Sequence, residues 1–347
     1  LDAGASSDWL WKDRRVLVFD GSTVLMPDTP ENQADYPQNV AQKPGLGFPI
    51  ARIAALFSLS CGAVVDLGIC RYAGKGQSEL GLLRTMWDNF RQGDIRLADS
   101  LMCTWTEIAM LKQRGGDYLC HLNSSNRSAD FGRGKIISID DHIVEWPKTK
   151  RPDAIDKKTY NTLPEFLTIR ECRFKIEQPG FRCKEIVIAT TLLDPDKFTV
   201  IDLAGLYRQR WSVELDLRSL KSVMQMDMLR CKTPELVRKE IWTHILAYNL
   251  IRTVMAQAAI KHEIDPRSVS FKGTLQTLER FQLAIDMIGQ HDCDLCMHLY
   301  QQLLDCVASH RVGNRPDRFE PRKIKRRHGK YDLLTKPRKE EKRLMVK

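Results

Sequence analysis

The chain has 347 residues, of which 43% are hydrophobic, so it can bury a sizeable core as two domains or as one large domain with an insertion. This composition favours a folded protein over an intrinsically disordered one. The net charge is +10, and almost all of the excess lies near the end of the chain, where residues 315–347 contain 14 Lys/Arg and 5 Asp/Glu.

This charge distribution predicts a polyanionic partner. A near-neutral body with a basic extension suits nucleic acid, because every phosphate that Lys or Arg neutralises releases condensed counterions. A tail that only increases solubility is the alternative.

Cysteine usage and the apolar stretches indicate the cellular compartment of the protein. The 10 cysteines are scattered rather than densely and evenly spaced, which favours reduced thiols in a cytosol over a secreted disulfide framework. Charged and polar residues interrupt the longest apolar stretches, residues 50–70 and 241–260, so no membrane span is expected. No signal peptide is visible, and because the sequence begins at Leu1 rather than Met, we expect that a segment precedes it.

The first third of the chain shows strand and helix patterns in alternation. Residues 14–19 form a β-rich run that ends at Asp20, where the following Gly-Ser predicts a turn. Residues 49–58 and 63–71 have strand patterns and are joined by a short turn, so we expect them to pair antiparallel. Further on, helices are expected at residues 80–91 and 103–114, and strands at residues 94–98 and 117–122.

This order of elements is typical of an α/β protein with an RNase H-like core, in which helices cover the sheet and active groups collect at strand ends. Short β-like pieces between polar loops then predict an all-β insertion. Apolar residues 186–189 return to the core, Asp202 is expected to cap the next helix, and a long helix follows at residues 236–257. We expect residues 1–120 and 186–265 to form the two parts of the core, with residues 121–185 as the all-β insertion between them. Residues 266–347 are expected to contain a helical segment at about 275–307, followed by a basic tail.

One helix in the second half carries a stripe of polar residues. Tyr207, Arg210, Glu214 and Lys221 follow one another at spacings of three, four and seven residues, so on an α-helix they share one face. A tyrosine, two cations and a carboxylate on one face can handle phosphate groups. A solvated, salt-bridged helix face is the alternative.

The stretch LYRQRWSVELDLRSLK contains the pattern Y-x2-R-x3-E-x6-K and resembles the signature of the insertion-sequence 4 family of DDE transposases. The segments DGSTVLMPDTPENQ, around Asp20, and GDIRLADSLMCTW, around Asp99, resemble the two aspartate motifs of that family. The resemblance covers about residues 13–338. One departure is the Ser-Leu-Met that follows Asp99, where relatives more often carry Arg-Gly-Phe. Taken alone, each aspartate is also compatible with an ordinary turn or cap.

The candidate catalytic residues are Asp20, Asp99 and Glu214. Phosphoryl transfer between nucleic-acid strands needs an activated oxygen nucleophile and neutralisation of charge on phosphorus, and two divalent cations supply both. Because hard cations such as Mg²⁺ prefer oxygen ligands, the protein must bring carboxylates together. We expect Asp20 to bridge two Mg²⁺ ions, Asp99 and Glu214 to hold one each, and Mn²⁺ to substitute.

Other residues are expected to contact DNA. Tyr207 and Arg210 would bind phosphates that flank the scissile bond, and Lys221 would bind the adjacent phosphate. Trp146, in the insertion, is a candidate for stacking on an unpaired base, as some relatives use aromatic residues of this region. An ordinary aromatic of a surface hairpin is the alternative. Trp211 could stack on a base or bury against the sheet, and burial is favoured.

The pattern His291-x-Cys293-x2-Cys296-x-His298 does not predict a zinc site. Its four groups fall within one apparent helix, whereas zinc ligands normally come from knuckles or from paired motifs far apart. Cys293 and Cys296 could instead face the core together.

The resemblance implies a cut-and-paste DDE transposase that uses Mg²⁺ to cleave DNA at transposon ends and to join the freed 3′-hydroxyl to target DNA. The expected partner is double-stranded DNA, both transposon ends and target, and the enzyme is expected to work as a homodimer in a synaptic complex in the bacterial cytoplasm, at the nucleoid. A hairpin intermediate is implied by some relatives only. Two alternatives remain: an inactive DNA-binding transposase relic, and an RNase H-like nuclease that cuts without strand transfer.

Overall fold

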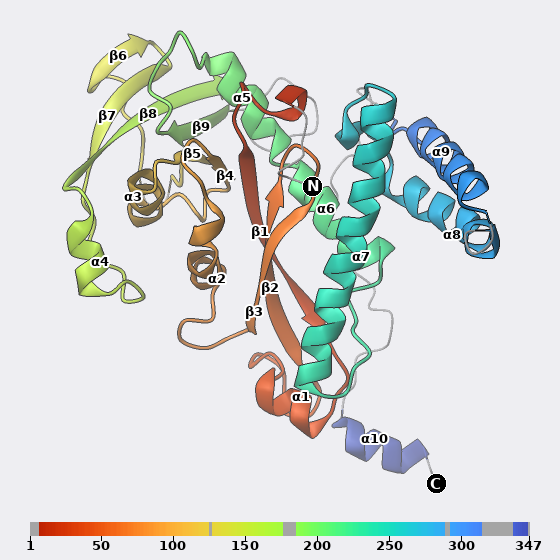
Figure 1. Ribbon diagram of the computed structural model, residues 1–347. Helices are drawn as coiled ribbons and strands as arrows, with labels where there is room; N and C mark the ends of the chain where they lie inside the picture. The colour runs from red at the N-terminus through yellow and green to blue at the C-terminus, as the bar shows by residue number, and fades with distance from the viewer. Residues whose placement is uncertain (1–6, 125–126, 176–184, 289–291, 314–335, 346–347) are drawn as a thin grey trace.

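A computed structural model of the chain describes residues 7–124, 127–175, 185–288, 292–313 and 336–345. Within these residues, nine strands form one mixed sheet in the order β3-β2-β1-β4-β5-β9-β8-β7-β6 (Figure 1). β1 is parallel to β4 and β4 is parallel to β5, whereas the other neighbours are antiparallel. The strands are β1 Val16–Leu25, β2 Ile50–Ser58, β3 Val64–Arg71, β4 Ile95–Ala98, β5 Asp117–His121, β6 Lys135–Ser138, β7 Asp141–Pro147, β8 Phe166–Lys175 and β9 Glu185–Thr190.

Helices cover both faces of the sheet. α2 and α3 pack on one face, and α5, α6 and α7 pack on the other (Figure 1). The helices are α1 Pro30–Asp35, α2 Glu79–Thr85, α3 Trp105–Gln113, α4 Lys157–Thr162, α5 Val200–Gln209, α6 Ser212–Arg218, α7 Pro234–Lys261, α8 Phe271–Ile288, α9 Cys293–Ser309 and α10 Arg338–Met345, with the short helices η2 Ser7–Trp9, η3 Trp87–Asn89, η4 Ser219–Val223 and η5 Pro266–Ser268.

Strand β1 runs through the middle of the molecule and is buried on both faces. Val16 and Val18 belong to the core that includes α5, α6 and α7, while Leu17 and Phe19 belong to the core that includes α2 and α3. This alternation follows from the two-residue period of a strand. Asp20 has the same parity as Val18 and therefore points toward α5 and α6.

The expectation that the first strand ends at Asp20 is wrong. β1 continues to Leu25, and Asp20 pairs with Ala55 of β2 inside the ladder. Backbone hydrogen bonds from this long partner keep the chain extended through Gly21, where the sequence had suggested a turn. On the other side, β4 ends at Ala98, so the carboxylate of Asp20 still lies beyond the end of a neighbouring strand.

Several other predictions concern local structure. The antiparallel pair expected at residues 49–58 and 63–71 is confirmed as β2 and β3, and their turn contains Gly62 with φ +72°. The long helix expected at residues 236–257 is confirmed as α7, which begins with Pro234 at a position that needs no N–H donor.

Three helix predictions need correction. The pattern at residues 80–91 forms α2 and the short η3, and the C-terminal helical segment consists of two helices, α8 and α9. The cap of α5 is Thr199 rather than Asp202. Asp202 lies three residues later, where its side chain accepts the backbone N–H of Thr199 and completes a capping box.

The segment expected to be an all-β insertion extends the same sheet. β9 pairs with β5 on one edge and with β8 on the other, and β7 and β6 follow outward. The segment also contains the helix α4, so the expectation of purely β structure is wrong. The result is one continuous sheet from β3 to β6.

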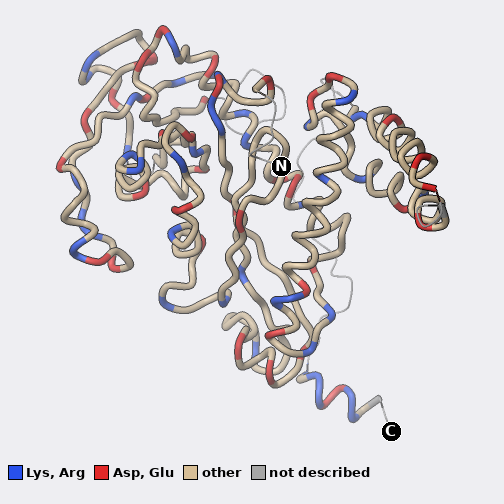
Figure 2. The backbone as a smooth tube through the Cα atoms, in the orientation of Figure 1, with Lys and Arg blue, Asp and Glu red and all other residues tan. Residues whose placement is uncertain are grey.

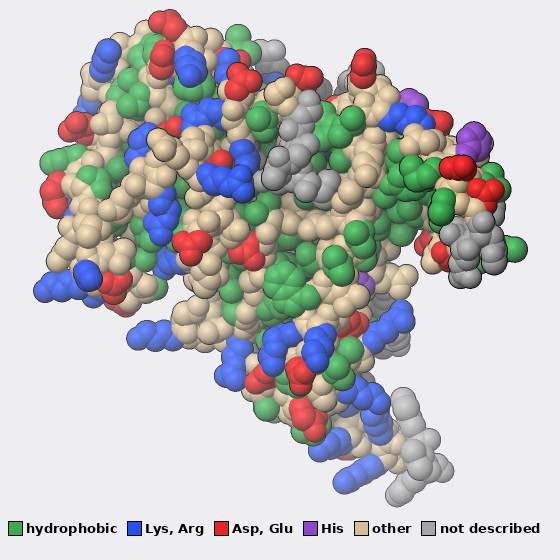
Figure 3. Space-filling model, in the orientation of Figure 1, with side chains coloured by type: hydrophobic (Ala, Val, Ile, Leu, Met, Phe, Trp, Pro, Cys, Tyr) green, Lys and Arg blue, Asp and Glu red, His purple; other side chains and the backbone are tan. Residues whose placement is uncertain are grey.

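Most of the basic tail lies outside the described residues, and α10 is its described end. Arg338 contacts Asp28 at 3.3 Å, donates to the carbonyl of Gly47 at 2.9 Å, and lies 3.6 Å from the ring centroid of Phe48. These contacts place the start of α10 beside the chain that leads into β2, and Figure 2 shows the Lys and Arg positions of α10 in blue. Over the face shown in Figure 3, acidic and basic side chains are otherwise interspersed.

Among the described residues, no helix is both long enough and apolar enough to cross a bilayer.

Candidate active site

Two parallel strands place the predicted aspartates side by side. Val18 of β1 pairs with Leu97 of β4, so two residues further along each chain Asp20 lies beside Asp99. Val18 and Leu97 both belong to the core on the side of α5 and α6, and residues two apart on a strand share a face. The two carboxylates therefore face the helices that carry the polar stripe.

A third strand adds a residue that the sequence analysis missed. Ala98 of β4 pairs with Cys120 of β5, so the next residues, Asp99 and His121, are neighbours. His121 thus extends the row across three strands. The available signal was a polar residue near the end of the strand predicted at residues 117–122, next to the strand that leads into Asp99.

The environment of Asp20 disfavours its charged form. Burial raises the pKa of Asp20 to about 6, although a hydrogen bond from the backbone N–H of Gly21 and the charge of Arg210 act in the opposite direction. The neighbouring carboxylates of Asp99 and Glu79 add to the rise. The Gly21 N–H lies 2.8 Å from Oδ1 of Asp20. Asp20 is therefore a half-buried acid whose charge the protein compensates only in part.

Asp99 lies in the loop that follows β4. Its Oδ1 accepts a hydrogen bond from the backbone N–H of Met102 at 3.1 Å, which orients the carboxylate at the strand end. The departure from the family pattern falls in this loop. Because the contact uses a backbone group, the unusual side chains at these positions do not remove it.

The polar stripe does not lie on one regular α-helix, as the sequence analysis had assumed. α5 ends at Gln209, α6 begins at Ser212, and η4 follows as a π-helix. At the junction, N–H groups bond to carbonyls three residues earlier, including Glu214 to Trp211 at 3.1 Å. The backbone of Arg210 remains right-handed helical, so the chain tightens locally but keeps its direction.

The stripe nevertheless follows strand β1. Nη2 of Arg210 donates to Oε1 of Glu214 at 3.2 Å, and Nζ of Lys221 donates to Oγ of Ser22 at 2.9 Å. Burial alone would lower the pKa of Arg210, but Tyr207, Glu214 and Asp20 together raise it. Arg210 is therefore a firmly charged cation between the carboxylates of Glu214 and Asp20.

Tyr207 and His121 meet at the other end of the stripe. Their ring centroids are 6.2 Å apart with an interplanar angle of 59°. Burial raises the pKa of Tyr207 to about 12, so its hydroxyl stays protonated. Burial and the charge of Arg210 lower the pKa of His121, while Asp99 has the opposite influence. Both rings are half-buried and neutral at pH 7.

The opposite side of α6 carries a buried ion cluster. Asp216 is 2% exposed, is hydrogen-bonded to Arg252 of α7, and accepts Nη1 of Arg267 at 2.9 Å. Residues two apart on a helix point in nearly opposite directions, so this cluster holds α6 from the side away from Asp20. Glu214 points to the other side of α6, where Arg210 contacts it.

The carboxylates are the residues that could hold a divalent cation. In the part of the chain that the structure describes, no three His, Cys, Asp or Glu side chains are grouped closely enough to hold one metal ion. Asp20 and Asp99 are neighbours, whereas Glu214 is paired with Arg210. Carboxylate oxygens are the ligands that Mg²⁺ prefers, so the chemistry of Asp20 and Asp99 suits a hard divalent cation. The structure brings these two carboxylates together but does not group Glu214 with them.

The prediction for Trp146 is wrong because this side chain is buried. It is 2% exposed, its indole N–H donates to Oε1 of Glu171 at 2.8 Å, and its carbonyl accepts the indole N–H of Trp105 at 3.0 Å. β7 is flanked by strands on both edges, and α3 covers this face. An enclosed, hydrogen-bonded indole has no free face for a nucleic-acid base.

The prediction for Trp211 is wrong in the opposite sense. Its side chain is 48% exposed, although burial was favoured. Arg210 faces the sheet, and the next residue on a helix points about 100° away from it.

The Cys/His pattern near the C-terminus lies on α9, except for His291, which is outside the described residues. Cys293 is exposed and Cys296 is half-buried, so the expectation that both face the core is wrong for Cys293.

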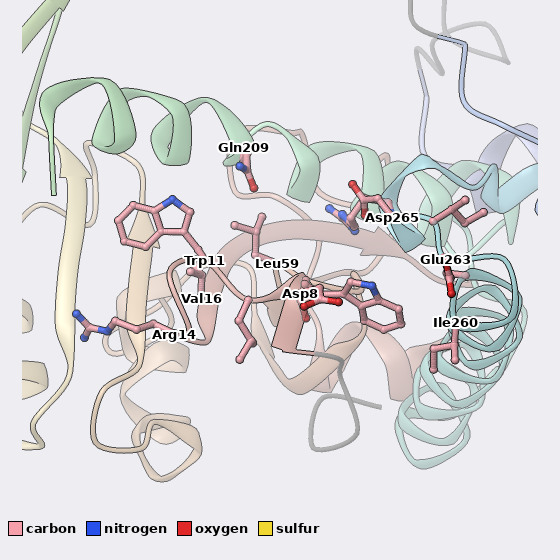
Figure 4. A pocket seen from close by; sticks show the side chains of 15 residues that line it. Asp8, Trp11, Arg14, Val16, Leu59, Gln209, Ile260, Glu263 and Asp265 are labelled. Carbon is pink, nitrogen blue, oxygen red and sulfur yellow. Dashed lines mark hydrogen bonds between the residues drawn. The ribbon is translucent and has the colours of Figure 1, made fainter. Parts of the chain in front are cut away.

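A cavity of about 640 Å³ lies at the other end of β1 (Figure 4). Val16 and Leu59 line it on the sheet, with Trp11 from the N-terminal segment, Gln209 from the end of α5 and Glu263 from the end of α7. None of the three predicted catalytic carboxylates lines it, so this cavity is separate from the row of Asp20, Asp99 and His121.

Comparison with known families connects these features. The family described as "Transposase DDE domain" matches residues 11–250. The chain belongs to this family. The matched region contains both aspartates and the whole polar stripe, and the protein is therefore a DNA transposase by class.

Individual relatives agree with this assignment. The chain is 26% identical over 337 residues to "Transposase InsG for insertion sequence element IS4" of Escherichia coli (strain K12), which covers 94% of this chain and 71% of the relative. It is 35% identical over 82 residues to "Putative transposase InsL for insertion sequence element IS186A" of the same strain, covering 24% of this chain and 21% of the relative. A solved structure, "Cryo-EM structure of piggyBac transposase synaptic complex with hairpin DNA", aligns with a TM-score of 0.45 and 10% identity over 85% of this chain and 53% of that chain.

Proposed function

We propose that this protein cleaves DNA at transposon ends and joins the freed 3′-hydroxyl to target DNA, as in cut-and-paste transposition. The observation that carries the proposal is the register of β1 and β4. It sets Asp20 beside Asp99 on the face of the sheet that is turned toward the helices of Arg210 and Glu214. We further propose that residues 1–120 and 186–265 form an RNase H-like core and that residues 121–185 are inserted into it. Residues 266–347 are the C-terminal part.

In this proposal Asp20, Asp99 and Glu214 hold two divalent cations, Mg²⁺ or in its place Mn²⁺. When bound, the cations activate the attacking oxygen and neutralise charge that develops on phosphorus. The support is the neighbouring position of Asp20 and Asp99 at the ends of paired strands, together with the preference of Mg²⁺ for carboxylate oxygens.

The cations of the stripe would hold the DNA backbone. Arg210 offers a planar guanidinium with several N–H donors, which suits two oxygens of one phosphate. Tyr207 offers a hydroxyl that stays protonated, and Lys221, next to Ser22, offers a point charge. These groups position the strand without reading its sequence.

The proposed partner is double-stranded DNA, both transposon ends and target. A homodimer in a synaptic complex and work at the nucleoid of a bacterial cytoplasm belong to the same proposal and follow from the family resemblance. Light scattering of the protein with and without an end duplex would test the dimer; one copy of the chain per duplex in every complex would contradict it.

Cleavage of a labelled end duplex in the presence of Mg²⁺ tests the chemistry. The variants D20N, D99N and E214Q should each lower the cleavage rate by about 10³-fold or more while the Kd for DNA stays within about threefold. D196N, which changes an exposed carboxylate in the loop before α5, is the matched control and should leave the rate unchanged.

The products separate the proposal from its alternatives. Joined products support transposition. Nicks without joining would favour an RNase H-like nuclease, and binding without any cleavage would favour an inactive relic. Cleavage that persists in D20N or D99N would remove that residue from the catalytic set.

A further inference from the structure

We propose that His121 is a DNA-contacting residue of this site, and that its imidazole donates a hydrogen bond to a backbone phosphate of the strand bound beside Asp99. This inference rests on the proposed function. It adds a residue from a third strand to the carboxylates of β1 and β4 and to the stripe on the helices.

The position of His121 is the first argument. The β4/β5 register makes it the neighbour of Asp99, and the alternation of β5 turns it to the same face as Leu119, which belongs to the core beside α5 and α6. A DNA strand that Arg210 holds across Asp20 and Asp99 would pass close to His121, at this end of the row.

The second argument is that the imidazole is available. His121 is half-buried, and among the described residues no hydrogen bond is made by its ring nitrogens. Its ring is nevertheless held in place, because Tyr207 packs against it at 6.2 Å between centroids. A polar group that is oriented but unbonded at the surface of a site is suited to a ligand contact.

A histidine of the same sheet shows what a purely structural role looks like. His142 of β7 is fully buried, and both of its ring nitrogens have partners: Nδ1 lies 2.8 Å from the carbonyl of Arg133, and Nε2 lies 2.9 Å from Oε2 of Glu171. His121 has neither the enclosure nor the partners, so packing alone does not account for it.

The test compares variants that separate packing from hydrogen bonding. H121F keeps an aromatic ring against Tyr207 but has no donor, and H121Q restores a donor at a similar reach. H298A, on the exposed face of α9, is the control. With an end duplex, H121F should bind or cleave about three- to tenfold less well, and H121Q should recover most of the loss. Thermal melting of each variant is measured first, and H121A replaces H121F if the phenyl variant does not fold.

A scan of the DNA locates the contact. Duplexes carrying a neutral methylphosphonate at one phosphate at a time around the scissile bond should identify one phosphate whose modification weakens the wild type and H298A, but has little further effect in H121F. Equal binding and cleavage by H121F and the wild type would overturn the inference. A methylphosphonate effect that is as large in H121F as in the wild type at every phosphate would also overturn it. Because D99N tests the chemistry separately, an inactive D99N with a fully active H121F would refute only the role of His121.

Discussion

Two carboxylates differ in how their charge is compensated: the buried Asp216 of α6 and the half-buried Asp20 of β1, which faces α6. Asp216, on one side, is paired with both Arg252 and Arg267. Asp20, on the other side, receives one backbone hydrogen bond, from Gly21, and only the more distant charge of Arg210, so burial raises its pKa to about 6. The first carboxylate stabilises the packing of a helix, and the second is left with a charge that a ligand can compensate.

The paired carboxylate also depends on a glycine. A Cβ added at Gly62 would lie 2.0 Å from Nη1 of Arg267 and 2.9 Å from Cζ of Arg252. With φ +72°, this position is already unfavourable for other residues. The turn between β2 and β3 therefore leaves the space in which the two arginines reach Asp216.

The largest effect is expected from D216A, which removes the structural carboxylate. The buried guanidinium of Arg252 and the partly buried one of Arg267 would lose their countercharge, and we expect the free energy of unfolding to fall by about 3–5 kcal/mol. Denaturant unfolding measures this change. D305A, which breaks an exposed ion pair with Lys261, is the control and should have little effect. A D216A variant as stable as the wild type would show that the cluster does not hold α6.

In contrast to D216A, D20N is expected to raise the free energy of unfolding at pH 7. Because the folded state raises the pKa of Asp20 from 3.8 to about 6, ionisation of this side chain destabilises the fold increasingly as the pH rises from about 4 to 6, and fully above that range. Asparagine carries no charge, so the metal-free variant should gain about 3 kcal/mol in free energy of unfolding at pH 7.

The pH dependence checks the cause. Below about pH 4 Asp20 is protonated in the folded and the unfolded state, so the gain of D20N should disappear there. A loss of stability in D20N at pH 7 would mean that Asp20 is as well compensated as Asp216, and the contrast between the two carboxylates would fail.

The smallest effect, on DNA binding, is expected for K221A. Lys221 lies in η4 and contacts Ser22 of the strand that carries Asp20. Loss of one phosphate contact should weaken binding to all DNA sequences alike and lower the slope of log K against log salt by about one. Binding titrations at several salt concentrations measure the slope. K239A, on the exposed surface of α7, is the control. An unchanged slope in K221A would remove Lys221 from the DNA-binding surface.

Much of the fold could be predicted from local patterns. β2, β3 and α7 follow from the strand and helix periodicity of their own residues, and the three sequence motifs by themselves indicate the family. These features depend on neighbours within a few residues, which the sequence states directly.

The sequence by itself also supplied the candidate residues Asp20, Asp99, Glu214, Tyr207, Arg210 and Lys221, whose roles stay predictions. Only the tertiary structure decided that β1 continues through Asp20, that His121 joins the row, and that Trp146 is buried while Trp211 is exposed. Each of these depends on strand register or on a covering helix supplied by residues far away in the chain. Burial and register are properties of such distant partners, so no local pattern of residues encodes them.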